Sequence, residues 1–209
     1  MPALSTDAME DRREALLLAA FRVFGRKGYH SASIRDICKE AGTSVGGLYV
    51  HFNGKEDIIA AVAEMFRSRR EKAVEAQTSD TKSTRTSARL SAALRAAAIA
   101  PYRDDRATLL ADVALMGQAV HIPALKSVLQ ETDKEHIARH ASFIADAENL
   151  TSQQKSDLAH LVTAVGYGLV TLSAYDDEFR PDGCIRLLES LLANVLDAGQ
   201  LSAAGEAPE

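Results

Sequence analysis

Between Gly28 and Lys55, the sequence GYHSASIRDICKEAGTSVGGLYVHFNGK predicts two short helices, over residues 33–41 and 44–51, joined by a tight turn at Gly42. This is the spacing of a helix-turn-helix, a motif whose second helix enters the major groove of DNA. That groove is about 12 Å wide and admits one helix. The segment is therefore a candidate DNA-binding unit. Two helices this short need further helices of the chain to pack against.

Capping signals mark the ends of these helices. Ser33 and Asp36 can form a capping box at the start of the first helix, and Ser44 can cap the second. A longer helix is then expected to begin with Asn53 as its cap and Glu56 as the partner of that cap. Each predicted helix therefore has a start signal of its own.

Two glycines open the second short helix, in the sequence Val45-Gly46-Gly47. A glycine costs a helix about 0.5–1 kcal/mol relative to alanine, so a helix that only packs would not favour two of them. Glycines allow the backbone to approach another surface, such as DNA. A loose loop or a close crossing of two helices explains this pattern equally well, and the pattern alone leaves all three interpretations open.

The segment resembles the signature of the TetR family of transcriptional regulators, and the resemblance is strong over roughly residues 10–60. Departures occur at Cys38, Thr43 and Val50, and at Gly47, where the family often has Thr or Ser. The matching residues are Leu17, Ala19, Ala20, Phe24, Gly28, Tyr29, Ser33, Ile34, Ile37, Ala41, Gly42, Ser44, Gly46, Leu48, Tyr49, His51, Phe52, Lys55, Glu56 and Asp57.

The resemblance implies a set of DNA contacts. A core position for Tyr49 and a solvated position for His51 are the alternatives at these two residues. The implied contacts are Ser31, Ser33 and Lys55 to phosphate, Arg35 as added charge, Ser44, Val45 and Gly46 to base edges, Gly47 beside them without the usual side chain, and Tyr49 and His51 to phosphate or a base.

The composition favours an all-α fold, because the chain has 5 prolines and 12 glycines in 209 residues and few signals for strands. The resemblance implies an N-terminal three-helix helix-turn-helix domain over residues 1–56 and a C-terminal helical domain for ligand binding and dimerisation over 57–209. Loops or unstructured ends are expected at 1–8, 77–87 and 201–209. Helices are expected over 10–26, 53–75, 88–100, 104–120, 123–147, 152–175 and 183–198.

Charge and composition exclude several classes of protein. The formal net charge is −5, but residues 1–56 carry eight Lys/Arg and seven Asp/Glu, so the acidity belongs to the remainder. Cys38 and Cys184 make neither a disulfide framework nor a zinc site. We expect no signal peptide, and no apolar run of the roughly 18–20 residues that a membrane span needs, which predicts a cytoplasmic protein. No catalytic or cofactor fingerprint occurs, so we expect neither an enzyme nor a bound cofactor.

The family resemblance implies a homodimer formed by the last two long helices. Gly166 and Gly168 would allow close helix crossing. The alternative is that both apolar stripes of these helices pack inside one subunit. The stripes consist of Leu158, Leu161, Val162, Val165 and Leu169, and of Leu187, Leu188, Leu191, Leu192, Val195 and Leu196.

A pocket for a small hydrophobic ligand is expected among the middle helices, although plain core packing explains each of its residues too. His136 and His140 share a helical face but make an incomplete metal site, so we expect solvated histidines and no metal. The candidate lining residues are Met65, Phe66, Tyr102, Met116, His121, Phe143 and Tyr167.

The sequence therefore predicts a DNA-binding transcriptional regulator, most simply a repressor that a small-molecule ligand releases from a palindromic operator. Two rival hypotheses remain at this stage. One is a DNA-binding dimer that responds to no ligand. The other is a helical enzyme or adaptor whose N-terminal helices contact protein instead of DNA.

Overall fold

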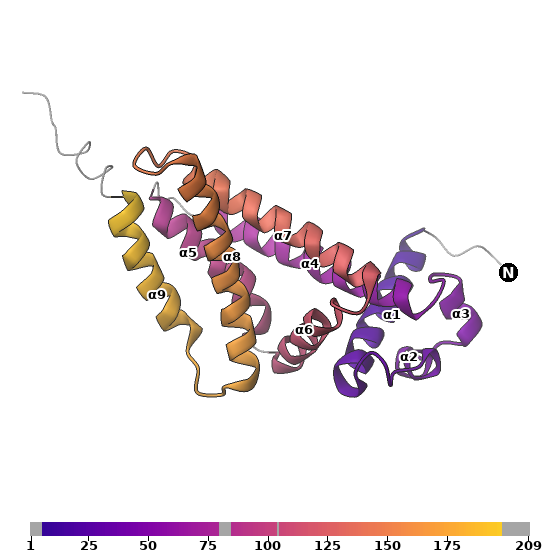
Figure 1. The fold of residues 1–209 in the computed structure, drawn as a ribbon. Helices are drawn as coiled ribbons and strands as arrows, with labels where there is room; N and C mark the ends of the chain where they lie inside the picture. The colour runs from indigo at the N-terminus through magenta and orange to yellow at the C-terminus, as the bar shows by residue number, and fades with distance from the viewer. Residues whose placement is uncertain (1–5, 80–84, 104, 198–209) are drawn as a thin grey trace, which may run out of the picture. The chain divides into compact units, whose positions relative to one another are not determined.

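The computed structural model describes residues 6–79, 85–103 and 105–197, and these ranges contain helices and no strand (Figure 1). The all-α prediction is confirmed. The predicted tail over 201–209 and part of the predicted 77–87 loop lie outside the described residues. The helices are α1 (Thr6–Lys27), α2 (Ile34–Ala41), α3 (Val45–Tyr49), α4 (Lys55–Ser79), α5 (Thr86–Ala98), η1 (Ala100–Tyr102), α6 (Arg106–Gln118), α7 (Pro123–Ile144), α8 (Ser152–Tyr175), α9 (Pro181–Leu192) and the π-helical turn η2 (Ala193–Asp197).

The chain divides into two compact units, and each of them is discontinuous in sequence. Unit 1 consists of Met1–Ser68 and Asp105–Glu131, and unit 2 consists of Arg69–Asp104 and Thr132–Glu209. The predicted domain boundary after residue 56 falls in the first turn of α4. The division of function at that boundary stays a prediction.

The core of unit 1 forms around the apolar face of α1. Leu17, Ala20, Val23 and Phe24 are all buried, as their helical spacing predicts. Helix α1 packs against both α2 and α6. Helix α6 approaches so closely that a Cβ on Gly25 would lie 2.8 Å from the Cβ of Ala111. A helix from the middle of the chain therefore supports the N-terminal helices.

Two helix starts in unit 1 differ from the prediction. Helix α1 begins at Thr6, four residues before the expected start at Glu10. Helix α4 begins at Lys55, and the residue that pairs with Asn53 is Asp57 instead of Glu56. The backbone N–H of Asn53 donates to Oδ2 of Asp57 over 2.9 Å. The prediction of Glu56 is wrong because Asp57 reaches the cap from one residue beyond the usual capping-box spacing.

Unit 2 is built on α5, which packs against both α8 and α9. Helix α8 begins with a capping box between Thr151 and Gln154 and keeps the predicted bounds. At the contact between the helices, a Cβ on Gly166 would lie 3.4 Å from Cδ2 of Leu94. Gly166 therefore provides close packing with α5 inside the subunit, while Gly168 is exposed.

The two histidines of α7 are not solvated, which corrects the prediction from their spacing. His140 is buried, and its Nδ1 lies 3.0 Å from Oγ1 of Thr163. Burial lowers the pKa of both His136 and His140 to about 4, and the charges of Arg70 and Arg139 add to this effect at His136. Among the described residues no group of three or more His, Cys, Asp or Glu side chains could hold a metal ion.

By length and composition alone, helix α8 is long and apolar enough to cross a membrane. Its most apolar 18-residue window has a mean hydropathy of 1.4, and 33% of that window is buried within the protein. Buried helices of soluble proteins meet the same criteria, and a single such helix is weak evidence for a span. Most of this apolar window is therefore not buried within the single chain, and packing inside the subunit does not account for it.

Candidate nucleic-acid interface

The helix-turn-helix predicted from the sequence is present in unit 1. Helix α2 ends at Gly42, whose φ of +63° is a left-handed conformation that glycine adopts at little cost. Ser44 then caps α3, and its Oγ accepts a hydrogen bond from the N–H of Gly47 over 3.1 Å. The capping box of Ser33 and Asp36 also forms as predicted. These three features fix the turn between the helices.

Ion pairs tie α2 to the C-terminal half of α1. Arg22 and Arg26 both contact the carboxylate of Glu40, at 2.9 and 2.5 Å, and Lys27 contacts Asp36 at 2.6 Å. Hydrogen bonds from Arg26 and Arg22 lower the pKa of Glu40. Exposed pairs of this kind add little stability, but they engage three cations of α1 within the protein.

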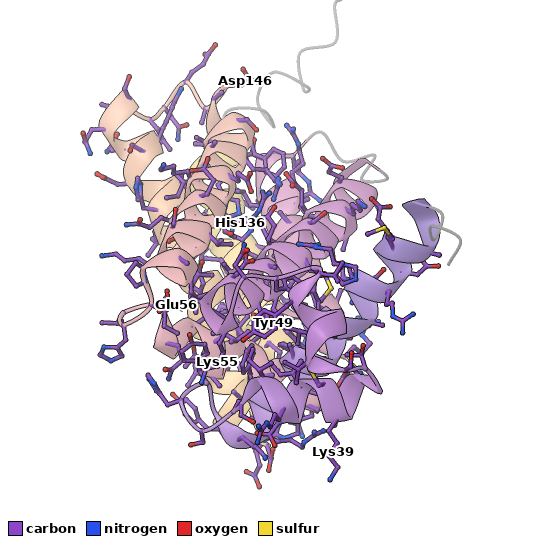
Figure 2. The ribbon with its side chains drawn as sticks, turned by 90° about the vertical axis from the view of Figure 1, so that its right-hand side faces the viewer. Lys39, Tyr49, Lys55, Glu56, His136 and Asp146 are labelled. Carbon is purple, nitrogen blue, oxygen red and sulfur yellow. The ribbon has the colours of Figure 1, made fainter. Side chains whose placement is uncertain are left out.

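Helix α3 presents one face to solvent. Leu48 is fully buried, whereas 53% of the surface of Tyr49 is exposed, so the alternative of a core tyrosine is excluded. Val45 and Val50 are exposed as well. Figure 2 shows Tyr49 on the side of this unit that faces the viewer, together with Lys39, whose side chain points away from the protein. An exposed tyrosine between exposed apolar residues suits contact with DNA bases and sugars.

The two glycines of α3 occupy different surroundings. Only Oγ of Ser44, 4.0 Å away, would lie near a Cβ on Gly46, so this position is open toward solvent. A Cβ on Gly47 would lie 2.8 Å from Oγ1 of Thr43. The open side of Gly46 permits close approach of another molecule, whereas Gly47 makes room for Thr43 inside the motif.

The predicted phosphate ligands differ in how free their polar groups are. Ser31 and Arg35 are exposed. The Oγ of Ser33 donates to Oδ2 of Asp36 over 2.7 Å and also accepts from the backbone N–H of Asp36. The hydroxyl of Ser33 is therefore already used within the cap, while Ser31 and Arg35 remain available to DNA.

Lys55 lies inside the protein's own hydrogen-bond network. Its Nζ donates to the carbonyl oxygens of His30, over 3.1 Å, and Ala32, over 2.8 Å. The ammonium also lies 4.4 Å from the centroid of the Tyr29 ring. Burial lowers its pKa. A phosphate contact by Lys55 stays a prediction, but its clearest role is to hold the loop between α1 and α2.

His51 is half-buried beside α3, and its ring centroid lies 6.3 Å from that of Phe52. It lines a shallow groove with a volume of about 310 Å³ on unit 1. Sequence reasoning selected Ser44, Gly47 and His51 as site residues and missed the other five residues of this groove. The only available signal was that Arg12 falls off the apolar face of α1. The lining residues are Met9, Arg12, Gly42, Thr43, Ser44, Gly47, Val50 and His51.

The predicted ligand-lining residues are distributed over both units. Met65 and Phe66 pack against the core of unit 1, in the part of the chain that also contains Met116 and the exposed His121. In unit 2, Arg70 donates to the Tyr102 hydroxyl over 2.6 Å, and the Tyr167 hydroxyl donates to Asp133. The guanidinium of Arg89 lies 4.4 Å from the centroid of the Phe143 ring.

Comparison with known proteins identifies this architecture. An exposed helix-turn-helix on an all-helical support defines a DNA-binding transcription regulator. Residues 16–62 match the family model of bacterial regulatory proteins of the tetR family. Residues 86–197, more than half of the chain, match the C-terminal model of BetI-type transcriptional repressors. The chain belongs to the TetR family of transcriptional regulators, and it is therefore a regulator and not an enzyme.

Curated relatives match over a limited length. The regulator UidR of Escherichia coli (strain K12) is 42% identical over 62 residues, which are 30% of this chain and 31% of UidR. The repressor AcnR of Corynebacterium diphtheriae is 35% identical over 63 residues, which are 30% of this chain and 33% of AcnR. The chain thus matches about a third of the length of these relatives.

Solved structures match over nearly the whole chain. A transcriptional regulator from Pseudomonas aeruginosa PAO1 has a TM-score of 0.80 at 24% identity, covering 90% of this chain and 92% of that one. GusR of Salmonella enterica has a TM-score of 0.70 at 25% identity, covering 90% and 96%. At this identity the first match establishes the fold alone.

Proposed function

We propose that this protein is a homodimeric repressor that binds a palindromic operator and leaves it when a small-molecule ligand binds. The exposed face of α3 is the observation that carries the DNA-binding part of this proposal. Two such helices, related by a two-fold axis, would read half-sites separated by about one helical turn of DNA or a multiple of it. A cytoplasmic location follows from this function.

Exposed apolar residues on the last two helices support the dimer. On α8, Leu161, Leu172 and Tyr175 are exposed, with the small residues Ala164 and Gly168 between them at steps of three and four. Such a stripe lies on one side of a helix. A partner helix would remove this apolar surface from water, which would also account for the unburied part of α8.

A second stripe on α9 and η2 has the same character. Leu187, Leu191 and Val195 are exposed at steps of four residues, whereas Leu192 and Leu196 are buried. The predicted stripe therefore consists of residues that pack inside the subunit and residues that face solvent. Two exposed stripes on neighbouring segments of the chain favour a four-helix contact between two subunits.

Ligand binding is the less supported half of the proposal. The BetI-type repressor model covers residues 86–197, and one solved structure of the same fold, from Saccharomonospora viridis, is a complex with choline. That protein is 19% identical, so its ligand does not transfer to this chain. A dimer that responds to no ligand remains the second candidate, because Tyr102, Tyr167 and Phe143 are already engaged by the protein's own side chains.

Binding of the purified protein to DNA from upstream of its own gene tests the proposal. We expect tight binding whose affinity falls steeply with salt, and at least tenfold weaker binding by Tyr49→Ala, because an exposed tyrosine on α3 would contact DNA. Leu110→Ala is the matched control, since Leu110 is exposed in unit 1 but lies on α6. Failure of the folded wild type to bind either this DNA or a randomised pool would overturn the DNA-binding function.

A further inference from the structure

The groove beside α3 has the composition of an anion site. Arg12 contributes a guanidinium, Thr43 a hydroxyl and His51 an imidazole, and no carboxylate lines the groove. The N–H groups of Gly42 and Gly47 already donate within the protein, so side chains supply the donors of the groove. Since Arg binds phosphate oxygens through charge-assisted hydrogen bonds, an anion with oxygen ligands is the natural occupant.

Arg12 differs in its partners from the other arginines of α1. Arg22 and Arg26 both pair with Glu40, and Arg13 lies with its guanidinium 5.3 Å from the centroid of the Phe52 ring. Within the described parts of the chain, Arg12 has no carboxylate at ion-pair distance and no hydrogen bond. Its charge is therefore available to a molecule that enters the groove.

The position of the Thr43 side chain at the groove requires that residue 47 has no side chain. A Cβ there would come within 2.8 Å of Oγ1 of Thr43, and the chain has no such Cβ. The hydroxyl of Thr43 therefore lies where a side chain at residue 47 would otherwise be.

We propose that Arg12 and Thr43 bind a backbone phosphate of the operator in this groove, beside the face of α3 that meets the bases. The inference rests on the proposed DNA-binding function and adds two residues to it. Ser44, Gly47 and Val50 belong both to the groove and to α3 or its flanking residues, so a phosphate here would lie next to the bases that α3 reads. Contacts to phosphate fix the register of a protein on DNA without specifying sequence.

The salt dependence of DNA binding tests this assignment. The probe is a labelled duplex selected from a randomised pool by the wild type, titrated at several salt concentrations with wild type and Arg12→Gln. We expect the slope of log K against log salt to fall by about 0.9 for each phosphate that the variant no longer neutralises, and by about twice that for a dimer with two grooves. Arg12→Lys should keep most of the slope, and Thr43→Val should weaken binding several-fold with the slope nearly unchanged.

Lys126→Gln is the matched control, because Lys126 is an exposed cation of unit 1 on α7 and the variant loses the same charge. Equal slopes for Arg12→Gln and Lys126→Gln, with both proteins folded and the wild type binding DNA, would overturn the phosphate site and leave the regulator function intact. If the wild type binds no DNA, both proposals fail.

Thermal unfolding in inorganic phosphate at constant ionic strength distinguishes a groove that binds a free anion from one that binds a DNA phosphate. We expect the DNA slope to fall in Arg12→Gln whether or not phosphate stabilises the wild type more than the variant. Stabilisation of the wild type alone, without a change in the DNA slope, would assign the groove to a free anion and overturn the proposal.

Discussion

Oγ1 of Thr43 occupies the space that a side chain on Gly47 would need, since a Cβ there would lie 2.8 Å from it. The two positions are therefore coupled. Alanine is favoured over glycine in a helix by about 0.5–1 kcal/mol, but at residue 47 this gain is opposed by overlap with the threonine. We expect Gly47→Ala to be more favourable by about 1 kcal/mol in a Thr43→Ala background than in the wild type.

A double-mutant cycle in urea unfolding measures this coupling. Gly46→Ala serves as the control, because a Cβ at that position meets no atom closer than 4.0 Å. The effect of Gly46→Ala should be the same in both backgrounds. Additive effects of the changes at 43 and 47 would show that Thr43 moves aside at no cost.

Lys55 is expected to contribute to stability through its loop contacts. Lys55→Met keeps most of the apolar stem but leaves the carbonyls of His30 and Ala32 without their donor and removes the cation from the Tyr29 ring. The loss should be about 1–3 kcal/mol in the free energy of unfolding, even without DNA. Lys39→Met, at an exposed position on α2, should change it by less than about 0.5 kcal/mol.

Chemical denaturation of the two variants side by side decides the role of Lys55. Equal stabilities would mean that the carbonyl contacts contribute little and would leave the phosphate contact as the role proposed for Lys55. A destabilised Lys55→Met protein would mean that DNA binding by Lys55 variants reports on the loop as well as on phosphate. For this reason Tyr49→Ala is the cleaner probe of the interface.

Local signals in the sequence were sufficient to predict most of the helix-turn-helix. Capping hydroxyls and a left-handed glycine act within a few residues, so Ser33, Gly42 and Ser44 could be assigned from sequence alone, and the structure confirms them. Contacts between distant segments could not be predicted in this way. Lys55 bonds to carbonyls 23 and 25 residues earlier, which no local pattern encodes.

The same limit explains the groove and the histidines. Arg12 reaches the turn only because α1 crosses the helix pair in three dimensions, and its place off the apolar face of α1 signalled no more than exposure. His136 and His140 looked solvated because a histidine is polar, but His140 is buried and α8 supplies Thr163 as its partner. Periodicity predicted which helices are apolar, and only packing decided which of their apolar residues face outward.

A charge placed on the exposed stripe of α9 should separate the proposed dimer. Leu191→Glu puts a carboxylate at a position that is 56% exposed in the single chain, where it costs the isolated subunit little. In a dimer the same carboxylate would be buried without a partner, at a cost of several kcal/mol for each copy. We expect sedimentation or light scattering to give a mass near the monomer value of 22.5 kDa for this variant and twice that for the wild type.

Leu110→Glu is the control for this experiment, because Leu110 is a leucine of similar exposure, 46%, on α6 of unit 1. It should leave the oligomeric state unchanged. A monomeric wild type, or a Leu191→Glu protein that remains dimeric, would exclude α9 from the dimer contact.

Stability should fall as the pH is lowered from 7 toward 5, because His136 and His140 are held neutral in the folded protein. Burial lowers the pKa of each to about 4, while an unfolded histidine titrates near its ordinary value of about 6.5. Between these values the unfolded chain binds more protons than the folded protein, so the free energy of unfolding decreases as pH falls. The full loss, reached below pH 4, is at most roughly 3 kcal/mol per histidine, and about half of it should appear by pH 5.

Urea unfolding of the wild type and of His136→Gln/His140→Gln over this range measures the effect. The wild-type curve should be the steeper one, whereas parallel curves would show that neither ring loses its proton on folding.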